Sequence, residues 1–246
     1  NSRAHAGDDR VAELTVAYTT GVVLLVPWLV ADPPTDVVGL VALSGLAHAG
    51  YLTLLAAAYQ RGSLAIAYPI ARGSAPLLVA VAAVWGLDQS VTTPLLVGAV
   101  LLGAGLVVVG GVAWGSGQRH ALAFALATGA TIATYSVLDA RGVDETGALG
   151  WFAAVSGVAV IVMVTGHRLS RHRLRAALRT GATVGLAQSA GYVLVLLAFA
   201  RADAGRVATL RGTSILFGLV LARRAVNSRI AFGALLVVAG AGLVVA

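Results

Sequence analysis

The chain has 246 residues, of which 59% are hydrophobic and only 11% are charged, and its mean hydropathy is +0.90. This composition excludes an ordinary soluble domain and predicts a membrane protein, while the absence of cysteine excludes disulfides, thiolate metal sites and cysteine nucleophiles. The net charge of +7 does not indicate nucleic-acid binding, because the arginines lie mostly in short loops between apolar runs, where membrane topology explains them.

Nine apolar segments follow one another along the chain, and most have the roughly 20 residues that a helix needs to cross a bilayer. They are apolar all round, which predicts a helical bundle rather than a transmembrane barrel. Short turns join most of them, whereas the longer basic stretch 166–181 is expected to lie on the membrane surface. The predicted spans are 11–30, 37–59, 64–87, 94–115, 121–140, 150–166, 182–200, 205–222 and 229–246.

Arginine is distributed unequally between the two sides of these spans. Most loop arginines fall on one side, and only Arg141, Arg201 and Arg206 fall on the other. The excess predicts that the first side is cytoplasmic, with residue 1 inside and Ala246 outside. Four tryptophans lie at predicted span ends, where an aromatic ring is expected in the headgroup region: Trp28, Trp85, Trp114 and Trp151.

The chain repeats itself. The segment AGYLTLLAAAYQRG from Ala49 resembles AGYVLVLLAFARAD from Ala190, and ARGSAPLL from Ala71 resembles LRGTSILF from Leu210. A third pair, GAVLLGAG and GALLVVAG, aligns Gly98 with Gly233. These pairs predict two repeats, 1–115 and 121–246, within a single membrane domain.

The repeat also predicts how the two halves are oriented. The span at 121–140 should have a partner before residue 1, so we expect nine spans of a ten-helix parent whose first helix is missing. Five spans per repeat is an odd number, which requires the halves to be inverted in the membrane. Inverted repeats are typical of secondary transporters that work by alternating access.

The chain resembles the drug/metabolite transporter superfamily, and specifically its EamA-type permeases. The resemblance is carried by AYPIARGSAPLLVAVAAV at 67–84, ATIATYSVLDARGV at 130–143 and GALLVVAGAGLVVA at 233–246. It implies ten helices in two five-helix inverted repeats, and a central cavity lined by the second, third, seventh and eighth spans of this chain. The chain departs from the family in its missing first helix and in the predicted outside location of the inferred parent's termini.

Two arginines are expected inside the membrane, where each costs about 2.5 to 3.5 kcal/mol and should therefore face a cavity. Arg72 and Arg211 occupy matching positions in the two repeats, near mid-depth of their spans. Pro69 and Pro76 are expected to break the helix around Arg72 and turn its charge inward. The arginines could bind an anionic substrate, freed backbone carbonyls or Asp139, and the sequence leaves these alternatives open.

Other polar side chains in span interiors are candidates for the same cavity: Tyr51, Tyr192, Ser74, Thr213, Tyr68, Tyr135, His48 and Gln188. Proton coupling requires a group that titrates within the membrane, and His48 and Asp139 are the candidates. A facilitator or an exchanger without proton coupling remains an alternative.

The sequence thus predicts a multi-pass permease or exporter of the cytoplasmic membrane, moving small metabolites such as amino acids or other anionic or zwitterionic solutes. An enzyme is not expected, because no metal-spaced cluster of histidines and carboxylates and no serine, histidine and aspartate set is evident. No cofactor, metal or nucleic-acid partner is expected, and a homodimer remains open. The alternative is a non-transporting membrane subunit or degenerate fragment.

Overall fold

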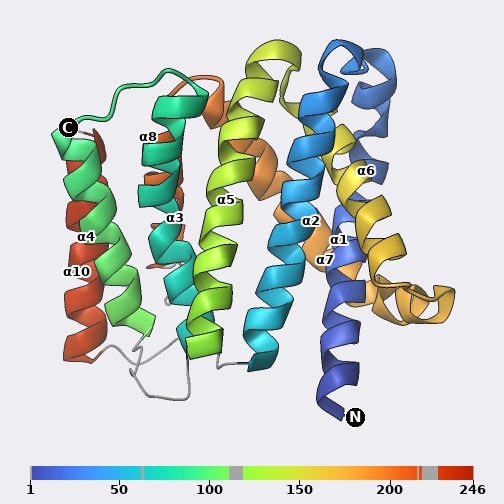
Figure 1. Ribbon diagram of the computed structural model, residues 1–246, viewed down its shortest axis with the longest axis horizontal. Helices are drawn as coiled ribbons and strands as arrows, with labels where there is room; N and C mark the ends of the chain where they lie inside the picture. Colours follow the sequence, from blue (N-terminus) through green and yellow to red (C-terminus); the bar gives the residue numbers. More distant parts are fainter. Residues whose placement is uncertain (1, 62–63, 111–118, 215, 218–226, 246) are drawn as a thin grey trace. The chain divides into compact units, whose positions relative to one another are not determined.

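The computed structural model describes residues 2–61, 64–110, 119–214, 216–217 and 227–245 (Figure 1). Within these ranges the chain is helical and contains no strand, so the all-helical prediction is confirmed for them. The elements are α1 (Ser2–Ala31), η1 (Thr35–Val37), α2 (Val38–Arg61), α3 (Leu64–Gly86), α4 (Thr93–Gly110), α5 (Arg119–Thr146), α6 (Ala148–Gly166), α7 (Arg171–Phe199), α8 (Ala204–Arg211) and α10 (Ser228–Val245).

Six of the described helices are long and apolar enough to cross a membrane, and two shorter apolar helices coincide with further predicted spans. Many large apolar side chains point outward from them, among them Val30, which is 75% exposed, and Leu194, which is 67% exposed. Such outward-facing apolar side chains are costly in water but suit contact with lipid. The chain is therefore a multi-pass helical membrane protein. The eighth predicted span, 205–222, lies partly outside the described residues, so the count of nine stays a prediction.

The helices form two compact units, and each draws on both halves of the sequence. The first unit comprises residues 1–60 and 138–201, and its helix α1 packs against α6 and α7. Its core is built from small and medium apolar side chains of α1, α2, α6 and α7, including Val16, Leu52, Ala159, Met163 and Ala177.

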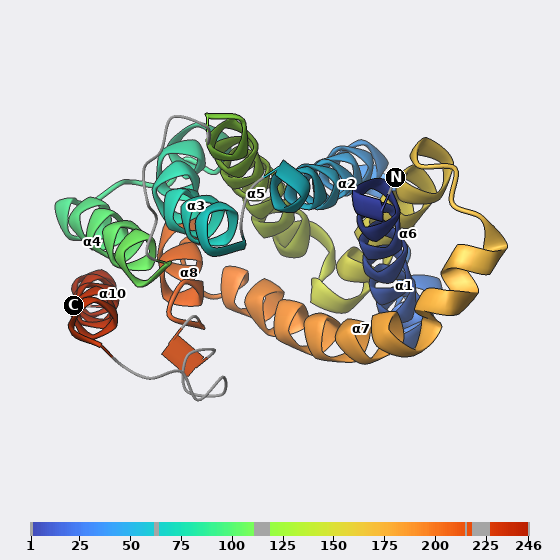
Figure 2. The same ribbon diagram turned by 90° about the horizontal axis from the view of Figure 1, so that it is seen from below.

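The second unit comprises residues 61–137 and 202–246. In it α3 packs against α4 and α8, and α10 lies beside α4, as both views show (Figures 1 and 2). Helix α5 is continuous from this unit into the first, with Val137 and Leu138 at the boundary.

Four glycines bring α4 and α10 into backbone contact. A Cβ atom added at Gly98 would lie 2.6 Å from the carbonyl oxygen of Gly240, and one at Gly105 would lie 2.6 Å from that of Gly233. The reverse approaches, from Gly240 to Gly98 and from Gly233 to Gly105, are 2.5 and 2.9 Å. Only glycine permits this spacing, and the order of the pairs shows that the two helices run antiparallel.

The structure corrects two local predictions. Helix α3 runs unbroken through Pro69 and Pro76, so the predicted break beside Arg72 is wrong. In the matching segment of the second repeat α8 does end, at Arg211, with Gly212 as its C-cap residue. The predicted surface connector is also wrong in part, because α7 begins at Arg171 and continues into the apolar span without interruption.

Candidate functional site

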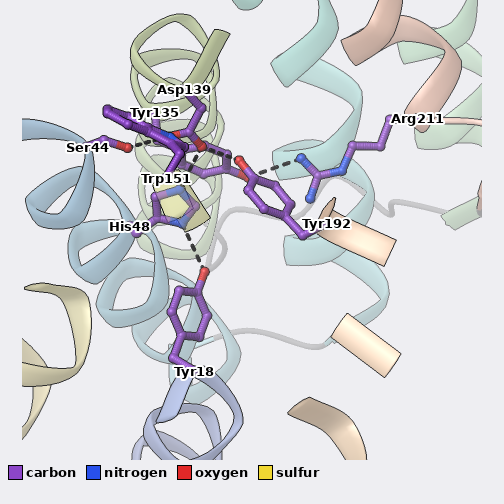
Figure 3. Close-up of polar contacts among 8 residues, drawn as sticks. All are labelled: Tyr18, Ser44, His48, Tyr135, Asp139, Trp151, Tyr192 and Arg211. Atoms are coloured by element: carbon purple, nitrogen blue, oxygen red, sulfur yellow. Dashed lines mark hydrogen bonds and ion pairs between the residues drawn. The ribbon is translucent and has the colours of Figure 1, made fainter. Parts of the chain in front are cut away.

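A fully buried carboxylate lies in the first unit and accepts hydrogen bonds from four side chains (Figure 3). Asp139 Oδ1 accepts from Ser44 Oγ at 2.5 Å and from Trp151 Nε1 at 3.0 Å. Its Oδ2 accepts from Tyr192 Oη at 2.5 Å and lies 3.0 Å from His48 Nε2. A buried carboxylate without such partners would be very costly, so these donors stabilise Asp139 where it is.

The donors come from three helices that surround the end of α5. Ser44 and His48 are four residues apart on α2, which places both on one face of that helix. Trp151 is in the first turn of α6, and Tyr192 is in the second half of α7. Each of the four is less than a tenth exposed. One carboxylate on α5 therefore ties α2, α6 and α7 together.

A fifth side chain extends this network to α1. Tyr18 Oη lies 3.0 Å from His48 Nδ1, and its ring meets the imidazole edge-on. With a neutral imidazole, Nε2–H donates to Asp139 and Nδ1 accepts from the Tyr18 hydroxyl. With a protonated imidazole, both ring nitrogens donate, and the Tyr18 hydroxyl turns to accept. The contacts with Asp139 and Tyr18 are therefore compatible with either form of the imidazole.

Asp139 is less adaptable than His48. An indole nitrogen can only donate, so Oδ1 must remain an acceptor from Trp151 whatever the charge of the carboxyl group. A proton on Oδ1 or Oδ2 would require one of the remaining donors to reverse its role. The four donors thus occupy the acceptor positions of both carboxylate oxygens of Asp139.

The predicted arginines, Arg72 and Arg211, belong to the second unit. Arg211 is half-buried and donates from Nη1 to Tyr135 Oη over 3.5 Å, and Tyr135 itself is only 2% exposed. Arg72 is half-buried on α3, which packs against α8. Ser74 follows it and donates to the carbonyl oxygen of Ala71 at 3.3 Å.

The remaining predicted residues are divided between the units. In the first unit, Tyr51 packs half-buried against the apolar core and Gln188 is half-buried on α7. In the second, Thr213 lies just after α8 and donates to the carbonyl oxygen of Leu210 at 2.7 Å. Tyr68 lies in α3, but its side chain is outside the described residues. Within the described ranges, no group of three histidine or carboxylate side chains forms a candidate metal site.

Three members of the network were missed by the sequence analysis, namely Tyr18, Ser44 and Trp151. Trp151 was predicted to lie in the headgroup region, and this is wrong, because the side chain is fully buried and its indole nitrogen binds Asp139. Trp28 and Trp85 are 50% and 87% exposed, as an interfacial position requires, and Trp114 lies outside the described residues.

The fold and this site define a multi-pass helical membrane protein with a buried polar network inside a mainly apolar bundle. Twenty-five chains of solved structures match this chain, and one of them, a crystal structure of a protein, superposes with a TM-score of 0.74. It is 19% identical and aligns over 96% of this chain and 88% of its own. The likeness shows a shared fold. No family model and no curated protein matches the sequence.

Proposed function

We propose that the protein is a secondary transporter of the EamA type, which moves a small anionic or zwitterionic metabolite across the cytoplasmic membrane by alternating access. The observation that carries this proposal is the pattern of glycine contacts between α4 and α10. In the sequence repeat Gly98 aligns with Gly233 and Gly105 with Gly240. Gly98 contacts Gly240. When each residue is replaced by its counterpart in the other repeat, this contact becomes that of Gly233 with Gly105, which the structure also contains.

A two-fold axis between the repeats relates every contact between them to a second, equivalent contact. The two glycine contacts between α4 and α10 form such a pair. The antiparallel course of α4 and α10 supports an axis in the membrane plane, as in an inverted repeat. Transporters with inverted repeats change access by moving one repeat or bundle of helices against the other. The pattern is therefore expected of a transporter, whereas a simple structural subunit would have no need of it.

The substrate site is proposed around the two half-buried arginines of the second unit. Arg72 and Arg211 lie on α3 and α8, two helices that pack together and that carry matching segments of the repeat. A guanidinium group binds a carboxylate or phosphate through paired hydrogen bonds, which suits an anionic or zwitterionic solute. Tyr135 would hold the Arg211 guanidinium in place through its hydroxyl group.

The coupling site is proposed in the first unit, at His48 and Asp139. Ionisable groups inside a membrane bundle are expensive and are commonly part of ion or proton pathways. Helix α5 links this site to the second unit by continuous backbone, since Tyr135 and Asp139 are one turn apart on it. A shift of α5 that follows substrate binding at Arg211 would therefore disturb the donors around Asp139.

The substrate site is tested by a thermal-shift screen of the purified chain against amino acids, organic acids and phosphorylated metabolites. Stabilisation by one ligand class that is lost in Arg72→Ala and Arg211→Ala, and kept in the exposed control Arg201→Ala, is the expected result. Equal stabilisation in all variants would make the two arginines structural. No stabilisation by any ligand, together with no uptake into vesicles, would favour a non-transporting membrane subunit.

The coupling site is tested with the identified substrate in vesicles that contain a pH-sensitive dye. The wild-type protein should move protons together with substrate, and His48→Gln should retain substrate exchange while losing the proton signal. Proton movement that is undiminished in His48→Gln would remove His48 from the coupling role and leave the substrate site unaffected.

A further inference from the structure

Four exposed arginines gather where α6 turns into α7, and we call them the basic corner: Arg168, Arg171, Arg175 and Arg179. Arg168 lies in the connecting turn, and the other three follow at intervals of four residues on α7, which places them along one side of that helix. The transport proposal does not use this surface.

The orientation of the basic corner is fixed by the opposite side of α7. Ala177 is 7% exposed and belongs to the apolar core, against which Leu174 also packs. A Cβ atom added at Gly181 would lie 2.8 Å from the backbone oxygen of Glu13 on α1. Because this side is packed closely on α1, the helix cannot rotate to bury its arginines.

The charges of the basic corner are not compensated by the described part of the protein. Within it, none of the four arginine side chains makes a hydrogen bond or an ion pair, whereas Arg201 at the other end of α7 donates to the carbonyl oxygen of Leu197 at 2.8 Å. The sequence contains no aspartate or glutamate from residue 146 to residue 202. The first 13 residues, at the start of α1, carry three carboxylates and two arginines, which together offset one of the four charges at most.

The length of α7 places the basic corner at the depth of the lipid headgroups. The helix has 29 residues, or about 44 Å at 1.5 Å per residue, whereas the hydrocarbon core is about 30 Å thick. Roughly nine residues must extend beyond it, which matches the segment from Arg171 to Arg179. Like charges spaced four residues apart repel one another, and the positive end of the helix dipole adds to them. An anion at this position would relieve both effects.

We infer that the basic corner is a binding surface for anionic phospholipid headgroups. The phosphodiester of such a lipid accepts paired hydrogen bonds from a guanidinium group and lies at the depth that the α7 length requires. A basic cluster directly beside a membrane helix attracts anionic lipid by this mechanism, with an affinity that falls as salt is added.

The test compares lipid retention by the full chain in nanodiscs of phosphatidylcholine with and without phosphatidylglycerol. The corner variant replaces all four arginines by glutamine, and a matched control replaces four exposed arginines elsewhere: Arg141, Arg201, Arg206 and Arg229. Native mass spectrometry counts retained lipids, and the melting temperature in each lipid mixture reports stabilisation. We expect wild type and control to retain phosphatidylglycerol selectively, and the corner variant to bind it about fivefold more weakly per arginine removed.

Three outcomes would overturn the inference. Retention of phosphatidylglycerol by the corner variant at the wild-type level would show that the basic corner is not the site, and an equal loss in the matched control would show a nonspecific charge effect. Stabilisation by inorganic phosphate in phosphatidylcholine alone, equal to that by phosphatidylglycerol, would indicate a soluble anion. A single variant, Arg175→Gln, gives the same comparison if the fourfold variant does not fold.

Discussion

The Asp139 network should contribute strongly to stability, and the sharpest perturbation is Asp139→Ala. This change leaves four buried donors, those of Ser44, His48, Trp151 and Tyr192, without their acceptor. An unsatisfied buried donor costs about 1 to 3 kcal/mol in a soluble protein, and hydrogen bonds between membrane helices average about 0.6 kcal/mol. For four donors we expect a loss of about 3 to 6 kcal/mol, although removal of a buried charge acts in the opposite direction.

Asp139→Asn should cost less, about 1 to 3 kcal/mol. The asparagine oxygen can still accept from two donors, and a neutral His48 can present a lone pair to the new amide group. The free energy of unfolding is measured by titration with SDS in mixed micelles. Asp144→Ala is the matched control, because Asp144 is exposed on the same helix. Equal stabilities of Asp139→Ala and Asp144→Ala would refute the view that the carboxylate holds these helices together.

Further predictions concern individual side chains. In proteins that retain a single tryptophan, brominated lipids should quench the fluorescence of exposed Trp85 and leave that of buried Trp151 almost unchanged; equal quenching would contradict the burial. Gly105→Ala should destabilise the protein by about 1 to 3 kcal/mol in the same SDS titration, whereas Gly242→Ala, where a Cβ atom meets nothing within 4 Å, should not. Ser156→Ala should be neutral or slightly stabilising, because the buried hydroxyl group of Ser156 has no hydrogen-bond partner among the described residues; a loss above about 1 kcal/mol would show that it has one.

Hydropathy predicted the apolar helices well, because the requirement to satisfy every backbone polar group in lipid makes a long apolar run helical. It was less successful at their ends. The segment 171–181 is basic, so it was separated from the span that follows, yet nothing in its sequence stops a helix. Pro69 and Pro76 were given too much weight at α3, since membrane helices tolerate proline where nearby groups satisfy the freed carbonyls.

The polar network could be predicted only in part. His48, Asp139 and Tyr192 were identified singly as unusual residues in apolar spans, but their contacts depend on how α2, α5 and α7 pack. Ser44 could have been found, because it lies one turn from His48 on the same helix face. Trp151 could not, since its position at a span end is shared by interfacial tryptophans and only the tertiary contact with Asp139 distinguishes it.

Repeat-related contacts are also present in the first unit. Gly45 and Gly185 hold equivalent places in the segments that begin GLA and continue AGY. In each case an added Cβ atom would meet a backbone oxygen on the partner helix and a side chain three residues further on. These contacts are those of Gly45 with Val155 and Val158, and those of Gly185 with Ala17 and Thr20.

The same correspondence makes Tyr18 equivalent to Ser156. In the aligned segments GLAHAGY and GLAQSAGY, it makes His48 equivalent to Gln188 and Ser189. The hydroxyl group of Ser156 has no hydrogen-bond partner among the described residues, whereas Tyr18 binds the imidazole of His48. The hydrogen-bonded pair of Tyr18 and His48 therefore belongs to one half of the chain, and serine and glutamine side chains take its place in the other. In the proposed alternating-access cycle the two halves exchange conformations, so a contact between Tyr18 and His48 that has no counterpart in the other half would make the two end states unequal in energy. Under the proposed coupling at His48, a proton on its imidazole would change that inequality, as coupling of transport to a proton gradient requires.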